Sequence, residues 1–153
     1  MVLDEFLLLE GDDLISCLDI YQQELVVALI ENAKGDYKMA ADNWLSASPS
    51  YTYKFGGDSN HSSVFREKIF DEVEKFICGC DDGRYDKDRE ELNKQKDLSK
   101  GAIISFLSAC IGHYIGVAGA FIAPVLVLIF LSTGKIVKNA WCEMMKEKKA
   151  SVQ

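Results

Sequence analysis

The chain has 153 residues, of which 48% are hydrophobic and 27% are charged, with only two prolines. This length fits one folded domain, and the composition excludes collagen-like, low-complexity and wholly disordered chains. The formal net charge of −7 argues against nucleic acid as a partner, because neutralising phosphates requires a basic surface.

Charge is distributed unevenly along the chain. Residues 1–100 carry 22 acidic and 12 basic side chains, whereas residues 101–153 carry 2 and 5. The 34 consecutive positions 101–134 hold no Asp, Glu, Lys or Arg, although an ordinary surface helix shows a polar stripe. We therefore divide the chain into an acidic amphipathic helical region, with a loop at about 46–63, and a C-terminal apolar region with a basic end. Both are expected in one folding unit.

The start of the chain differs from a secretory signal. Residues 1–9 carry acids where such a peptide is basic, and their apolar run is short and lacks a small-residue cleavage site. We therefore expect the protein on the cytoplasmic side, and its association with the inner membrane is left open. The cysteines are odd in number and widely scattered, so they do not indicate a disulfide framework. They are Cys17, Cys78, Cys80, Cys110 and Cys142.

Two amphipathic helices are expected in the first third of the chain. Asp12 or Asp13 can cap a helix whose apolar residues recur at spacings of three and four. Gly35 then ends this helix, and Asp36 caps the next one. The sequence predicts that the two helices pack as an antiparallel hairpin.

A third amphipathic helix follows the loop. Ser62 or Ser63 can cap it, and its periodicity places Glu72 on the solvent side. Residues 85–100 are mostly charged or amide-bearing, which predicts a solvated helix held by ion pairs between neighbouring turns.

The uncharged segment is too long for one membrane-spanning helix. As a single helix its 34 residues would extend about 51 Å, against about 30 Å for a bilayer core. Gly119 and Pro124 lie near its middle, where they favour a turn. The sequence therefore predicts a hairpin of two apolar helices, near residues 102–115 and 123–137.

Small residues recur every four positions along the first of these helices. They are Ser108, Gly112, Gly116 and Ala120. Such a ladder lets two helix backbones approach closely, so we expect it to pack the hairpin. After the second helix, Lys135, Lys138 and Trp141 begin a basic amphipathic stretch suited to anionic headgroups or to an acidic protein surface. We predict these three residues at the interface with a membrane or a partner.

Residues suited to catalysis or metal binding are sparse. His113 lies in the uncharged segment, where a buried neutral imidazole is expected, and no base is placed to activate Cys110. Cys78 and Cys80 lack the second pair of ligands that a zinc site needs. We therefore expect no catalytic, cofactor-binding or metal-binding residues.

Together these patterns predict an all-α fold, a small helical bundle with an N-terminal amphipathic hairpin and a C-terminal uncharged hairpin. The favoured hypothesis is a non-enzymatic protein that associates with or inserts into a membrane, with the acidic half as a cytosolic regulatory part. The alternative is a soluble oligomeric adaptor whose apolar hairpin is the buried core or the subunit interface. Under either hypothesis lipid or protein must cover residues 101–134, and a homo-oligomer is expected.

Overall fold

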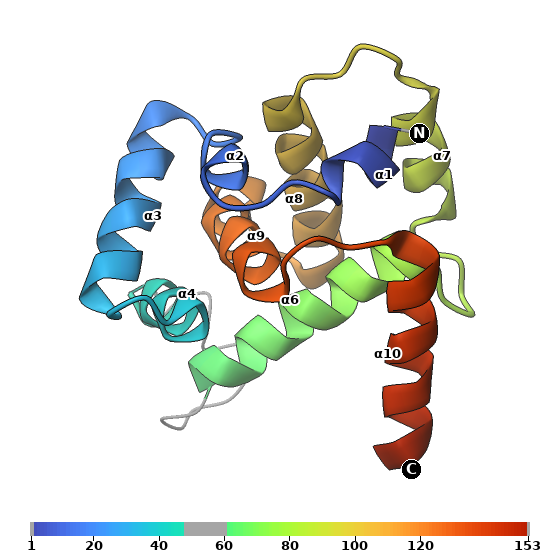
Figure 1. The fold of residues 1–153 in the computed structure, drawn as a ribbon. Helices are drawn as coiled ribbons and strands as arrows, with labels where there is room; N and C mark the ends of the chain where they lie inside the picture. The colour runs from blue at the N-terminus through green and yellow to red at the C-terminus, as the bar shows by residue number, and fades with distance from the viewer. Residues whose placement is uncertain (1, 48–60, 153) are drawn as a thin grey trace.

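The computed structural model describes residues 2–47 and 61–152, and within these ranges it contains nine α-helices and no β-strand (Figure 1). The predicted all-α class is confirmed. The loop expected at about 46–63 lies mostly outside the described residues. The helices are α1 (Val2–Phe6), α2 (Asp12–Ile15), α3 (Ile20–Asn32), α4 (Tyr37–Ser46), α6 (His61–Cys78), α7 (Asp86–Lys94), α8 (Lys100–Ile115), α9 (Gly119–Thr133) and α10 (Lys138–Val152).

The first predicted helix is divided into α2 and α3. Asp19 is in an extended conformation, and its carboxylate accepts a hydrogen bond of 2.8 Å from the backbone N–H of Gln22. This is N-cap geometry, which starts a new helix at Ile20. Apolar periodicity continues through Leu18 and did not reveal the break.

A tight turn joins α3 to α4. Gly35 adopts the left-handed conformation with φ 86°, and the Asp36 carboxylate accepts a hydrogen bond of 3.0 Å from the N–H of Met39. The two helices contact each other, but α3 runs along the plane of Figure 1 and α4 is seen nearly end-on. They therefore cross steeply instead of lying antiparallel.

Helices α6 and α7 close one side of the bundle. The apolar face of α6 is buried at spacings of three and four residues, through Phe65, Ile69, Val73 and Phe76. The solvated helix predicted over 85–100 is shorter than expected, since α7 ends at Lys94. Ser99 then caps α8 by accepting a hydrogen bond of 3.1 Å from the N–H of Ala102.

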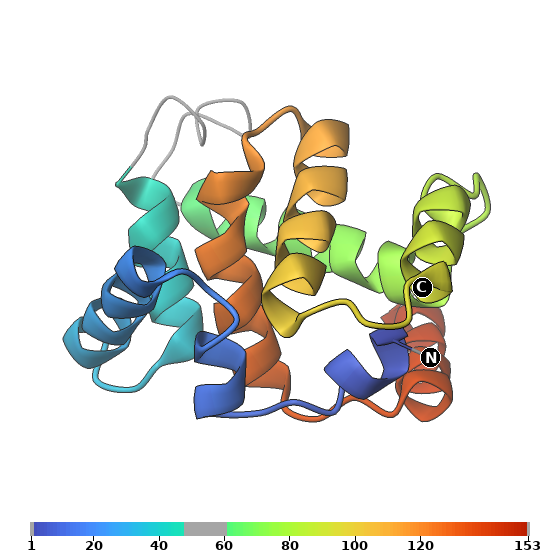
Figure 2. The ribbon, with the colours of Figure 1, turned by 90° about the horizontal axis from the view of Figure 1, so that it is seen from above.

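Helix α9 forms the centre of the bundle. Helices α2, α3, α4, α6 and α8 all contact it, and Figure 2 shows α9 between α4 and α8. Residues 121–130 are buried without interruption. A helix that is apolar all round must be covered on every side, and here the chain itself supplies the cover.

Helix α10 packs against α6 and then projects from the bundle towards the C-terminus (Figure 1). A disulfide joins Cys78, the last residue of α6, to Cys142 in α10. The number and spacing of the cysteines did not indicate a disulfide framework, and this single bond was not predicted. The separation of these two cysteines by 64 positions concealed a proximity that only the folding of α10 onto α6 creates.

Candidate functional site

The uncharged residues predicted to carry function form α8 and α9, joined by residues 116–118. Gly116 ends α8 in the left-handed conformation with φ 78°, and its N–H bonds to the Gly112 carbonyl at 2.8 Å. The two helix axes differ in direction by 114°. No single helix in the described residues is long and apolar enough to cross a membrane. Taken together as a bent pair, α8 and α9 have the length and the apolar composition of a membrane-spanning segment.

The backbones of α8 and α9 meet at two glycines. A Cβ atom at Gly112 would lie 2.4 Å from the Val117 carbonyl oxygen, and one at Gly119 would lie 3.2 Å from the Ala109 Cα. The first distance is well inside van der Waals contact with backbone. Any side chain at Gly112 therefore requires the turn to move.

The remaining small residues do not continue one packing stripe. Ser108 is buried in α8, and its hydroxyl has no hydrogen-bond partner within 2–47 and 61–152. Gly116 lies in the exposed cap, and Ala120 is exposed in the first turn of α9. The predicted ladder assumed a continuous helix, whereas its four-residue period stops where α8 ends at Ile115.

Pro124 lies inside α9 and not in the turn, which corrects its predicted role. Proline cannot donate to the carbonyl four residues earlier and crowds it sterically. That carbonyl belongs to Ala120, and it accepts a hydrogen bond of 3.1 Å from the Gln22 side-chain amide. The next carbonyl, of Phe121, accepts one of 2.9 Å from the Trp44 indole. Side chains of α3 and α4 thus satisfy α9 where the proline disturbs it.

The outer face of α8 is exposed and carries no charge beyond Lys100. Ser105, Ala109, His113 and Tyr114 all lie at the surface. His113 is therefore not the buried imidazole that was expected. Burial in the core accounts for the absence of charge from α9, but it does not account for the same absence on the solvent side of α8.

The three predicted interface residues have different surroundings. Lys135 is exposed and pairs with Glu10 at 3.4 Å, and Lys138 is half-buried at the start of α10. Trp141 is only 7% exposed, and its ring lies 6.2 Å from that of Phe70 between centroids. Trp141 therefore packs into the protein's own core, because α10 folds back onto α6.

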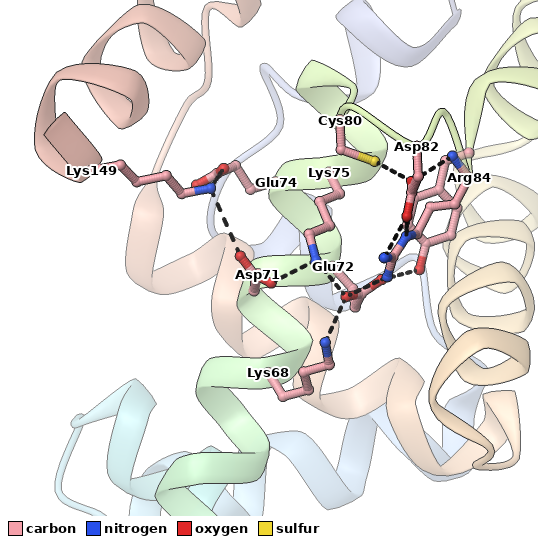
Figure 3. Close-up of polar contacts among 10 residues, drawn as sticks. Lys68, Asp71, Glu72, Glu74, Lys75, Cys80, Asp82, Arg84 and Lys149 are labelled. Atoms are coloured by element: carbon pink, nitrogen blue, oxygen red, sulfur yellow. Dashed lines mark hydrogen bonds and ion pairs between the residues drawn. The ribbon is translucent and has the colours of Figure 1, made fainter. Parts of the chain in front are cut away.

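A cluster of charged side chains surrounds Glu72, which is fully buried in α6 and not on the solvent side as predicted (Figure 3). The Tyr85 hydroxyl donates to its carboxylate at 2.7 Å, Lys68 at 3.0 Å and Arg84 at 3.1 Å. Lys75 lies 3.3 Å away. Four donors from α6 and from the segment before α7 thus converge on one carboxylate.

These contacts decide the protonation of Glu72. Burial acts to raise the pKa of Glu72, but the hydrogen bonds from Tyr85 and Lys68 and the charges of Lys68 and Lys75 outweigh it and lower the pKa to about 2. Burial and the Glu72 hydrogen bond together raise the pKa of Tyr85 well above its usual range. Both oxygens of Glu72 are occupied by side chains of the same chain, which is the arrangement of a structural ion-pair cluster.

Cys110 is not activated as a nucleophile. Burial raises the pKa of its thiol to about 12, and the nearby Asp88 and Glu91 carboxylates act in the same direction. The thiol is therefore protonated near neutral pH, whereas the thiolate is the reactive form.

Comparison of the chain with protein-family models, with curated proteins and with solved structures finds no match.

Proposed function

We propose that this protein is a non-enzymatic helical bundle that inserts its α8–α9 pair into a lipid bilayer when the surrounding helices move away. In the closed bundle the acidic N-terminal helices cover α9, and their displacement exposes it. This assigns the regulatory role to the acidic half of the chain and the membrane role to residues 101–134.

The observation that carries the proposal is the uncharged surface of α8. Ser105, Ala109 and His113 are exposed, so a charged residue at these positions costs little in the closed bundle. In a bilayer the same charge costs several kcal/mol, roughly 2.5–3.5 on insertion scales. Transfer of α8 into lipid therefore explains a composition that burial in the bundle does not.

The dimensions of the pair suit insertion from one side. At 1.5 Å per residue, α8 is about 24 Å long and α9 about 23 Å, both shorter than a bilayer core of about 30 Å. The start of α8 and the end of α9 lie on the same side of the bundle (Figure 2). Lys100 and Lys135 flank the pair at these ends, where their ammonium groups can remain among the headgroups.

The cover over α9 is largely apolar and exchangeable for lipid. The Trp44 ring lies 5.4 Å from that of Phe121, and Phe6 lies 5.5 Å from Phe130, between centroids. Lipid tails replace such contacts at little cost. The direct hydrogen bonds from Gln22 and Trp44 to α9 are specific interactions that displacement must break.

A soluble adaptor is the second candidate, and the burial of α9 residues 121–130 within their own chain favours it. On this alternative α9 is simply the core, and the uncharged face of α8 docks a helix of another subunit through small residues such as Ser105 and Ala109. The protein would then be a defined soluble oligomer that ignores lipid.

Flotation of the full chain with vesicles that contain anionic lipid tests the proposal, using Ala109→Lys against a control, Asn43→Lys. Both positions are exposed, so both variants gain one positive charge with little effect on the closed bundle. Insertion predicts that Ala109→Lys lowers vesicle binding at least tenfold, because the new charge lies about 14 Å along α8 from Lys100.

Asn43→Lys should bind at least as well as the wild type, since α4 remains outside the bilayer. Stronger binding by Ala109→Lys would indicate surface attraction alone and would contradict insertion. An absence of wild-type binding, together with a soluble oligomer that Ala109→Lys dissociates, would favour the adaptor.

A further inference from the structure

A cleft of about 300 Å³ opens between α4, α6, α9 and α10, outside the uncharged surface described above. Ligand pockets begin at roughly this size, and a cavity of about 150 Å³ already holds benzene. The cleft therefore has room for a chain of about ten carbons.

The floor of the cleft is apolar and comes from three helices. Leu128 and Ile129 of α9, Phe70 of α6 and Met145 of α10 line it. Helix α10 forms one wall because it is fixed to α6 near its start by the Cys78–Cys142 disulfide and near its end by an ion pair between Lys149 and Glu74. The cleft is thus a result of how α10 stands against the bundle.

The rim of the cleft is cationic in a chain whose net charge is −7. Lys38 and Lys148 are exposed and form no ion pair in the part of the chain that the structure describes. Arg66 is neutralised by Asp42 at 2.7 Å, and one exposed carboxylate, Glu67, also lies at the rim. Two unpaired ammonium groups on opposite walls thus outnumber one free carboxylate.

We propose that this cleft binds a single-chain amphiphile, with the apolar chain on the floor and an anionic head between Lys38 and Lys148. An apolar floor with a few polar groups that fix orientation is typical of small-molecule sites, and ammonium groups recognise carboxylate or phosphate heads. Free fatty acids and lysophospholipids share this chemistry. The inference does not depend on membrane insertion, since the cleft is formed by α4, α6, α9 and α10 in the closed bundle and includes no residue of α8.

Isothermal titration of the full chain with decanoate, below its micelle concentration, tests the proposal. We expect saturable binding of one decanoate per chain, and binding of decanol at least fivefold weaker because it lacks the charge. A lysophosphatidate with the same chain is titrated in parallel. Tighter binding of the lysophosphatidate assigns the site to a lipid headgroup, and tighter binding of decanoate assigns it to a free fatty acid.

Paired variants locate the site. Lys38→Gln with Lys148→Gln should weaken decanoate binding about fivefold. The control, Lys87→Gln with Lys96→Gln, removes the same charge at exposed positions outside the cleft and should leave binding unchanged. Met145→Trp should abolish binding by filling the cleft, provided that its unfolding transition remains cooperative.

Three results would overturn the proposal. They are the absence of saturable binding, equal weakening by both double-lysine variants, and wild-type affinity in a folded Met145→Trp protein. The surface lysine variants keep the test decisive if Met145→Trp does not fold.

Discussion

At the scale of single residues, Glu72 and Gly112 mark what helical periodicity can and cannot predict. The close approach at Gly112 is to the Val117 carbonyl, only five positions later, so both partners lie in one short segment. The burial of Glu72 depends on Arg84 and Tyr85, which lie 12 and 13 positions later, in the segment before α7. Position within α6 alone placed Glu72 in solvent, because the helical pattern of α6 contains Lys68 and Lys75 but not Arg84 and Tyr85.

Glu72 should make the stability of the protein depend on acid pH. Its pKa falls from 4.5 to about 2 on folding, so the ionised carboxylate contributes stability that is complete above about pH 4.5 and is lost as the pH falls towards 2. The contribution of the ionised Glu72 carboxylate to the free energy of unfolding is at most about 3 kcal/mol. Urea unfolding between about pH 6 and about pH 3 should show a weaker pH dependence for Glu72→Gln than for the wild type, although Glu72→Gln is less stable at neutral pH.

Glu90→Gln is the matched control for this measurement. Glu90 is exposed and lies 3.7 Å from Lys94, so its removal should leave the pH dependence of unfolding as in the wild type. Parallel curves of unfolding free energy against pH for Glu72→Gln and the wild type would show that the neighbours of Glu72 do not lower its pKa.

Gly112→Ala should destabilise the bundle by about 1–3 kcal/mol, because the added methyl group meets the Val117 carbonyl at 2.4 Å. The matched variant Ser105→Ala, on the exposed face of the same helix, should change the free energy of unfolding by less than about 0.5 kcal/mol. Chemical denaturation compares the two, and equal stabilities would refute the close contact between Gly112 and the turn that joins α8 to α9.

At the scale of elements, the sequence predicted the first apolar helix closely and misplaced the second. The predicted range 102–115 compares with Lys100–Ile115 for α8, but 123–137 compares with Gly119–Thr133 for α9. Pro124 caused this difference, because proline is normally read as a helix boundary. Its tolerance within α9 depends on donors from α3 and α4, which are 98 and 77 positions away from their acceptors.

The pairing of Gln22 with the Ala120 carbonyl should depend on Pro124. Gln22→Ala should cost about 0.5–1 kcal/mol in the wild-type chain, because it removes the donor to this carbonyl. It should cost almost nothing in a Pro124→Ala chain, where the restored N–H of residue 124 can bond the same carbonyl. A double-mutant cycle by urea unfolding measures this coupling, and strictly additive effects would exclude it.

At the scale of the whole molecule, the sequence established that residues 101–134 need a cover but not what provides it. An uncharged helix such as α9 can be surrounded by lipid, by a partner or by its own chain. In the closed bundle other helices of the same chain, α4 and α8 above all, surround α9, an arrangement fixed by long-range packing that no local pattern contains. In the part of the chain that the structure describes, the outer face of α8 stays uncharged and uncovered, and for that reason the proposed function depends on it.

Carbonate washing of vesicles incubated with the full chain tests most directly whether the α8–α9 pair leaves the bundle for lipid. Carbonate removes proteins held at a surface by charge but does not extract inserted apolar helices. Insertion predicts that the wild-type chain stays with the vesicles after the wash and that Ala109→Lys does not. Complete release of the wild-type chain into the supernatant, still folded, would contradict the central claim.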